Sequence, residues 1–113
     1  MSEESSRIRQ SGEVKIVDVN NYLGSYAVAE LRETLAGLVN QDVQKIIVNL
    51  SQVEHINSAA IGALIGTAKQ LRLKDGDVKI YGLTENIRRT FDLIGASDIV
   101  EIHDSEDSAL STF

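Results

Sequence analysis

The 113-residue chain has no cysteine and no proline, and it has no long hydrophobic run. The absence of cysteine excludes disulfide frameworks, cysteine-ligated metals and thiol nucleophiles. The longest apolar run, residues 59–68, is interrupted by Thr67 and is too short to cross a membrane. The first six residues are acidic and polar, unlike a signal peptide. We therefore expect a single domain spanning residues 1–113, located in the cytoplasm.

Positive charge is also scarce. Seventeen acidic residues stand against eleven basic ones, and the formal net charge is −6. Nucleic acids and anionic membranes are bound through clustered lysine and arginine, and the only adjacent basic pair is Arg88-Arg89. The sequence thus predicts neither nucleic acid nor membrane as a partner and favours another protein.

Hydrophobic periodicity predicts alternating strands and helices. Strands are expected at 7–10, 14–19, 45–50, 78–82 and 99–102, the first two joined by a tight turn at Ser11-Gly12. Helices are expected at 26–39, from Ser58 through Leu71, after Thr84 as N-cap, and after Asp104-Ser105. This order favours an α/β fold with parallel crossovers and one antiparallel hairpin.

Two loops, at residues 20–25 and 51–58, each follow the C-terminal end of an expected strand. Functional loops of such sheets gather at the carboxyl ends of strands, so we expect these two to share one rim. The second loop ends at a helix start that carries Asn57 and Ser58. Either residue could cap the helix. If Asn57 is the cap, the Ser58 hydroxyl points outward, and a phosphate there would add about −2 charge at the positive end of the helix.

The helix that begins at Ser58 has an unusually small face. Gly62 and Gly66 follow Ser58 at intervals of four, with Ala59 and Ala63 alongside. Each helical glycine costs about 0.5–1 kcal/mol relative to alanine, so the two require a reason. The residues leave two explanations open, which are close internal packing and close approach of a partner beside Ser58.

Catalytic groups are few. His55 lies near Ser58 in sequence, but neither it nor His103 belongs to a metal-binding or triad pattern, and a solvent-facing His55 is the simpler interpretation. No glycine-rich phosphate loop with a lysine is present. We expect no enzymatic activity, no cofactor and no metal.

The segment from Ile47 to Gly62, with Asn49-Leu50-Ser51 and Asn57-Ser58-Ala59-Ala60-Ile61-Gly62, resembles the signature of the STAS domain of bacterial anti-sigma factor antagonists. That signature is a strand ending in (D/N)-L-S, then D-S-(S/A/T)-G-L-G at a helix start. The resemblance covers nearly the whole chain. It implies a mixed sheet of four to five strands with four helices, mainly in a single layer on one face.

The resemblance also implies partner switching. An unphosphorylated antagonist binds a serine kinase that is also an anti-sigma factor; phosphorylation breaks the complex, and a serine phosphatase resets it. By alignment the phosphoacceptor is Ser58. The partner-binding residues expected here are Asn21, Gly24, Ser25, Asn57, Ser58, Ala59, Ala60, Gly62 and Gly66, on a monomer. The alternative is a STAS module that binds a partner or ligand without switching, as a transport accessory or regulatory subunit.

The chain departs from the family pattern at three positions. Asn57 stands where the family usually has Asp, Ala60 replaces the motif glycine, and Gly24 stands where an acidic residue is often found. Two carboxylates are therefore missing from the rim around Ser58, which mildly favours the non-switching alternative.

Overall fold

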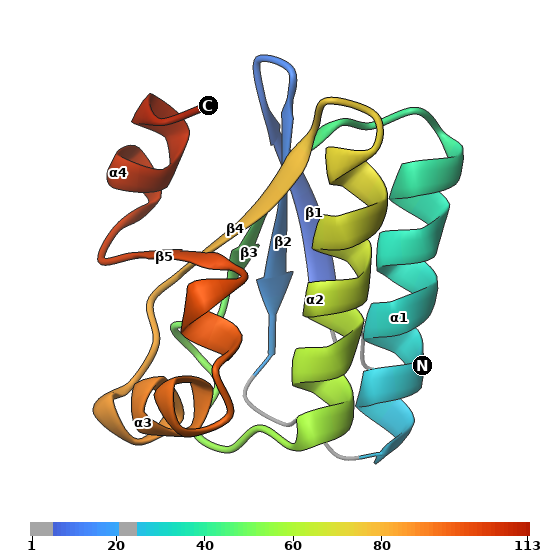
Figure 1. Ribbon diagram of the computed structural model, residues 1–113. Helices are drawn as coiled ribbons and strands as arrows, with labels where there is room; N and C mark the ends of the chain where they lie inside the picture. Colours follow the sequence, from blue (N-terminus) through green and yellow to red (C-terminus); the bar gives the residue numbers. More distant parts are fainter. Residues whose placement is uncertain (1–5, 21–24) are drawn as a thin grey trace.

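The computed structural model describes residues 6–20 and 25–113, which form a five-stranded mixed sheet and four α-helices (Figure 1). The strands are β1 (Ser6–Ser11), β2 (Val14–Val19), β3 (Lys45–Asn49), β4 (Asp77–Tyr81) and β5 (Glu101–His103). The helices are α1 (Ser25–Asn40), α2 (Ser58–Arg72), α3 (Glu85–Leu93) and α4 (Glu106–Ser111), with a short 3-10 helix η1 (Ala96–Asp98). The expected α/β fold is confirmed.

The spatial order of the strands follows the sequence, β1-β2-β3-β4-β5. β1 pairs antiparallel with β2, and all other pairs are parallel. Asp18 of β2 lies opposite Asn49 of β3, which in turn lies opposite Tyr81 of β4. The carboxyl ends of these three strands therefore share one edge, as expected for the strands that lead into the 20–25 and 51–58 loops.

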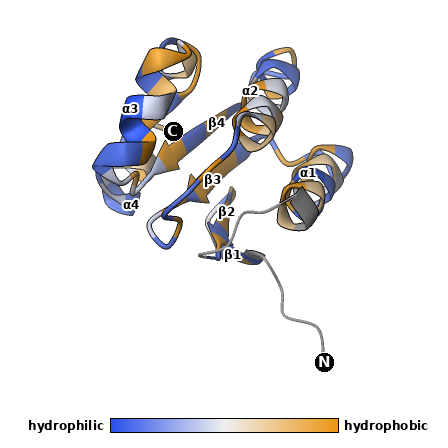
Figure 2. Ribbon diagram, turned by 90° about the horizontal axis from the view of Figure 1, so that it is seen from below, coloured by the Kyte–Doolittle hydropathy of each residue, from blue (hydrophilic) through white to orange (hydrophobic). Residues whose placement is uncertain are grey.

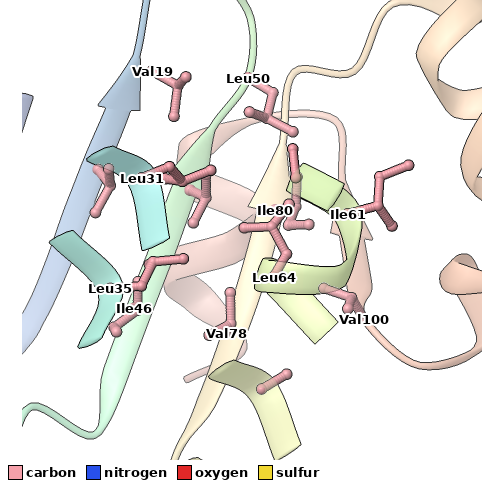
Figure 3. Close-up of a cluster of buried hydrophobic side chains, with 14 of the residues drawn as sticks. Val19, Leu31, Leu35, Ile46, Leu50, Ile61, Leu64, Val78, Ile80 and Val100 are labelled. Carbon is pink, nitrogen blue, oxygen red and sulfur yellow. The ribbon is translucent and has the colours of Figure 1, made fainter. Parts of the chain in front are cut away.

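The front face of the sheet is covered by α1, α2 and α3. Alternate strand residues such as Val17, Val48 and Ile80 point into this core and are fully buried. Figure 3 shows side chains from the strands meeting those of the two long helices, with Leu31 and Leu35 from α1 and Ile61 and Leu64 from α2. This apolar layer fixes the position of α2, and with it the position of Ser58.

The back face of the sheet is covered only in part, by α4, which lies on the side opposite α1 and α2 (Figure 2). The residues that pack there are Val14, Ile16, Ile47, Ala109, Tyr81, Leu110 and Phe113. The apolar residues near the C-terminus, Ala109, Leu110 and Phe113, thus face the sheet. They cover a second, smaller cluster rather than extending the main core.

A polar network closes one side of this smaller cluster. Arg9 of β1 donates to Asp18 at 2.8 Å and to Glu106 of α4 at 2.6 Å. The Tyr81 hydroxyl donates to the same Glu106 carboxylate at 2.9 Å. Hydrogen bonds from Arg9 hold the pKa values of Asp18 and Glu106 below their usual range. Burial, followed by the contact with Glu106, raises the pKa of Tyr81 to about 12.

Lys79 of β4 anchors the other end of the C-terminal segment. Its side chain is only 6% exposed, and Nζ donates to the Thr112 carbonyl at 2.8 Å. Glu101 pairs with it at 3.2 Å, and the Phe113 ring centroid lies 4.5 Å away. A nearly buried ammonium is tolerated here because it has acceptors and a counter-charge.

We expect the stability of the fold to fall in acid. Asp18 and Glu106 have lowered pKa values when folded, so the stability they contribute is present above their unfolded pKa, near 4, and is lost as the pH falls below it. Denaturant unfolding between about pH 7 and pH 3 measures this loss. A Glu106→Gln variant should show a smaller loss over the same range, and an equal loss would contradict this assignment.

The turn after α2 contains a residue in the left-handed conformation, Asp75, with φ of 63°. Gly76 follows it, and a Cβ there would lie 2.1 Å from the backbone oxygen of Gln44, so this position requires glycine.

The last strand also begins later than expected. Ile99 and Val100 follow η1, and the strand β5 starts only at Glu101. Gly95, with φ of 76°, ends α3, and the Val100 amide then bonds to Ala96 at 2.9 Å. This bond keeps Val100 buried in the main core before the chain enters the sheet. Among the described residues, no helix has the length and hydrophobicity needed to span a membrane.

Candidate functional site

The structure shows which of the two candidate residues caps the start of α2. Asn57 is the N-cap, and its side-chain oxygen accepts a hydrogen bond from the Ala60 amide at 2.9 Å. Ser58 is the first residue of the helix and is exposed. The Ser58 hydroxyl is therefore not needed to cap the helix, because Asn57 satisfies that role.

The first turn of α2, which begins at Ser58, carries no charged side chain, and the cap itself is an amide. In the described part of the chain, no side chain forms a hydrogen bond with the Ser58 hydroxyl. The helix dipole favours an anion at this end, so a phosphate on Ser58 would be compatible with the fold.

The other predicted partner-binding residues of α2 divide into two groups. Ala59, Gly62 and Gly66 are exposed, on the same side of the helix as Ser58. Ala60 is fully buried in the main core, so the prediction that it faces a partner is wrong. Its methyl group fills the interior where the family has a glycine.

Three predicted residues belong to the segment that the sequence predicts as a loop, residues 20–25. Ser25 is the first residue of α1. Asn21 and Gly24 lie outside the described residues, so their part in the site stays a prediction.

A surface groove runs between the two long helices. It is lined by Arg32 and Ala36 of α1 and by Ala59, Gly62, Ala63 and Gly66 of α2. A Cβ added at Gly62 or Gly66 would meet no atom of another described element within 4 Å. Close internal packing is therefore the wrong explanation for the two glycines. Of the two explanations that the sequence leaves open, the close approach of a partner remains.

We expect Gly62→Ala to stabilise the isolated protein by about 0.5–1 kcal/mol, because alanine is the better helix former and its methyl group meets open space. Denaturant unfolding measures the change. Gly82→Ala is the matched control: Gly82 has φ of 83°, and a Cβ there would lie 2.8 Å from the Cβ of Ser51. That variant should lose about 2 kcal/mol or more. Destabilisation by Gly62→Ala would show that the groove is packed after all.

The loop before Ser58 is held by a side-chain contact that sequence reasoning missed. The Asn49 side-chain oxygen accepts from the Ser51 amide at 2.9 Å and from the Ser51 hydroxyl at 2.6 Å. The Asn49 amide nitrogen donates to Asp18 at 2.8 Å. The signal was present in Asn49-Leu50-Ser51, but the pairing with Asp18 depends on strand register. The loop is thus tied to two strands of the sheet.

The two histidines have different surroundings. His55 is exposed in the loop before α2, in agreement with the simpler interpretation. His103 belongs to no triad pattern in the sequence, but in the structure its ring nitrogens lie 2.7 Å from the Ser108 hydroxyl and 2.9 Å from Glu101.

This array joins α4 to the sheet. Glu101 pairs with Lys79 of β4 at 3.2 Å, and His103 of β5 contacts the Ser108 hydroxyl of α4. The array therefore helps to hold α4 on the sheet. In the described part of the chain, no group of three potential metal ligands is found.

The model of the STAS domain family matches residues 5–109 of the chain. The chain belongs to the STAS domain family. The anti-sigma-B factor antagonist of Staphylococcus epidermidis is 33% identical to the chain over 88 residues, which cover 78% of this chain and 82% of that protein.

Solved STAS structures agree with the fold. A Thermotoga maritima protein assigned as an anti-sigma factor antagonist has a TM-score of 0.88 at 22% identity, covering 95% of this chain and 92% of that one. The anti-sigma factor antagonist SpoIIAA in its unphosphorylated form has a TM-score of 0.81 at 18% identity, covering 95% and 94%. These similarities confirm the expected STAS-like sheet and helices.

Proposed function

We propose that this STAS protein is a partner-switching regulator of the anti-sigma-factor-antagonist type, controlled by phosphorylation of Ser58. The observation that carries the proposal is the exposed Ser58 hydroxyl at the start of α2, left free by the Asn57 cap. The Staphylococcus relatives named anti-sigma-B factor antagonists support it. SpoIIAA of Bacillus, which shares the fold, has been solved in a phosphorylated form.

The proposed partner of the unphosphorylated form is a serine kinase that is also an anti-sigma factor. The small neutral surface of Ser58, Ala59 and Gly62 allows the backbone of α2 to be approached closely. A phosphate on Ser58 converts this surface into a bulky dianion at a helix end that tolerates it. The fold is then unchanged, and the complex is lost because the surface has changed.

The remaining parts of the proposal concern the cycle. A serine phosphatase returns Ser58 to its free hydroxyl, and the protein acts as a cytoplasmic monomer. No catalytic step is assigned to this chain, because the kinase and the phosphatase supply both reactions.

Phosphate mapping tests the proposal. The protein is incubated with ATP and a serine kinase of the anti-sigma-factor type from the same organism, and the modified residue is identified by mass spectrometry. We expect one phosphate on Ser58 and none on a Ser58→Ala variant. Phosphate on another residue, or none with a kinase that modifies its other substrates, contradicts the proposal.

One observation favours the alternative of a STAS module that binds without switching. Asn57 brings no charge beside Ser58, and the first turn of α2 has no carboxylate. Such a module would keep its partner whatever the charge on Ser58. Equal affinities of Ser58→Ala and Ser58→Asp variants for the kinase would support this alternative.

A further inference from the structure

We propose that Asn49 is a positioning residue that couples the C-terminal helix α4 to the loop that leads to Ser58. The inference rests on the proposed function only in so far as Ser58 is the switch site. The loop in question is residues 50–57, between β3 and α2. It begins at the carboxyl end of β3, where Leu50 is buried in the main core, and it ends at Ser58, the first residue of α2 (Figure 1).

A continuous series of side-chain contacts joins the two elements. Glu106 of α4 accepts from Arg9 at 2.6 Å, and Arg9 donates to Asp18 at 2.8 Å. Asp18 accepts from the Asn49 side chain at 2.8 Å, and Asn49 accepts from the Ser51 amide at 2.9 Å. Each member thus contacts the next, from α4 across β1, β2 and β3 into the loop.

Asn49 is the member whose chemistry makes the connection. Its amide nitrogen donates to a carboxylate, while its amide oxygen accepts two hydrogen bonds from Ser51. An aspartate at this position could still accept from Ser51, but it would set a second carboxylate against Asp18. The (D/N) position of the motif is therefore asparagine here because of the residue at position 18.

The helix α4 can detach from the sheet without unfolding of the rest of the domain. It has six residues, which is too short to be stable on its own. It is held by the small back-face cluster and by polar contacts at its two ends, through Glu106 and Thr112. Local unfolding of such a terminal segment is less costly than global unfolding. Release of α4 would remove Glu106 from Arg9 and free Arg9 and Asp18 to move, which loosens the support of Asn49.

Amide hydrogen exchange of the unphosphorylated protein, followed by NMR, tests the coupling. The Ser51 amide is the direct probe, because Asn49 is its acceptor. Glu106→Ala should speed exchange at Ser51 by about threefold or more, together with exchange in α4. Asp107→Ala is the matched control, since Asp107 is exposed in the same turn and makes no contact with the network. It should leave Ser51 unchanged.

A double-mutant cycle separates positioning through Asn49 from a general loss of structure. Asn49→Ala should speed Ser51 exchange by about threefold or more, and Glu106→Ala should add little to that change, because both variants act on the same support. A Ser51 amide that is unaffected by Glu106→Ala, or a Glu106→Ala effect on Ser51 that is the same with and without Asn49, overturns the inference. Neither measurement needs a kinase, so failure to phosphorylate Ser58 would reject the proposed function and leave this result standing.

Discussion

A Ser58→Asp variant is expected to bind the kinase partner about tenfold to a hundredfold more weakly than a Ser58→Ala variant. The carboxylate places a fixed charge at the neutral start of α2, on the surface that binds the kinase. That charge loses its hydration when the kinase docks. Alanine keeps the surface small and uncharged. Calorimetric or fluorescence titration of both variants against the kinase measures the difference.

Two controls make this comparison specific. Both variants should unfold at nearly the same denaturant concentration, because Asn57 and not Ser58 caps the helix. Gln52→Asp places the same charge on an exposed loop residue before α2 and should leave the affinity nearly unchanged. If Gln52→Asp weakens binding as much as Ser58→Asp does, the net charge of the protein causes the loss of affinity, and the position of Ser58 does not.

A Phe91→Ala variant is expected to lose about 3–5 kcal/mol of stability, the largest effect of any single change considered. Phe91 is fully buried on α3 and is the largest of the fully buried side chains in the main core. Truncation removes apolar burial and leaves a cavity that the close-packed sheet and helices cannot refill. Denaturant unfolding gives the free energy directly.

The neighbouring helix residue Leu93 provides the control, because it is 80% exposed. Leu93→Ala should change the stability by no more than about 0.5 kcal/mol. Comparable losses for the two variants would mean that α3 does not pack on the sheet as described. A large loss for Phe91 alone supports the arrangement that places the main core under α2.

The parts of the molecule predicted well from the sequence are those in which local chemistry and global packing agree. Short polar residues just before an apolar helical period mark the cap Thr84 and the candidate pairs Asn57-Ser58 and Asp104-Ser105. In the structure Asn57, Thr84 and Ser105 accept the cap hydrogen bonds. The consecutive apolar residues of β3 are typical of a strand covered on both faces, and Ile46 and Ile47 are buried on opposite faces.

What could not be predicted depends on contacts between distant segments. Ala60 follows two exposed residues in sequence, and only the packing of α2 on the sheet shows that it faces inward. The array around His103 requires α4 to fold back onto β5. The link from Asp18 to Asn49 requires the parallel register of β2 and β3. Sequence spacing carries none of these three relations.

The most direct test of the switch is to compare one protein in two covalent states. The chain is phosphorylated to completion, the single phosphate is mapped to Ser58, and the affinity of both forms for the kinase is measured in the same buffer. The account predicts that the phosphorylated form binds at least about tenfold more weakly, and that phosphatase treatment restores the original affinity. Equal affinities of the two forms would contradict it.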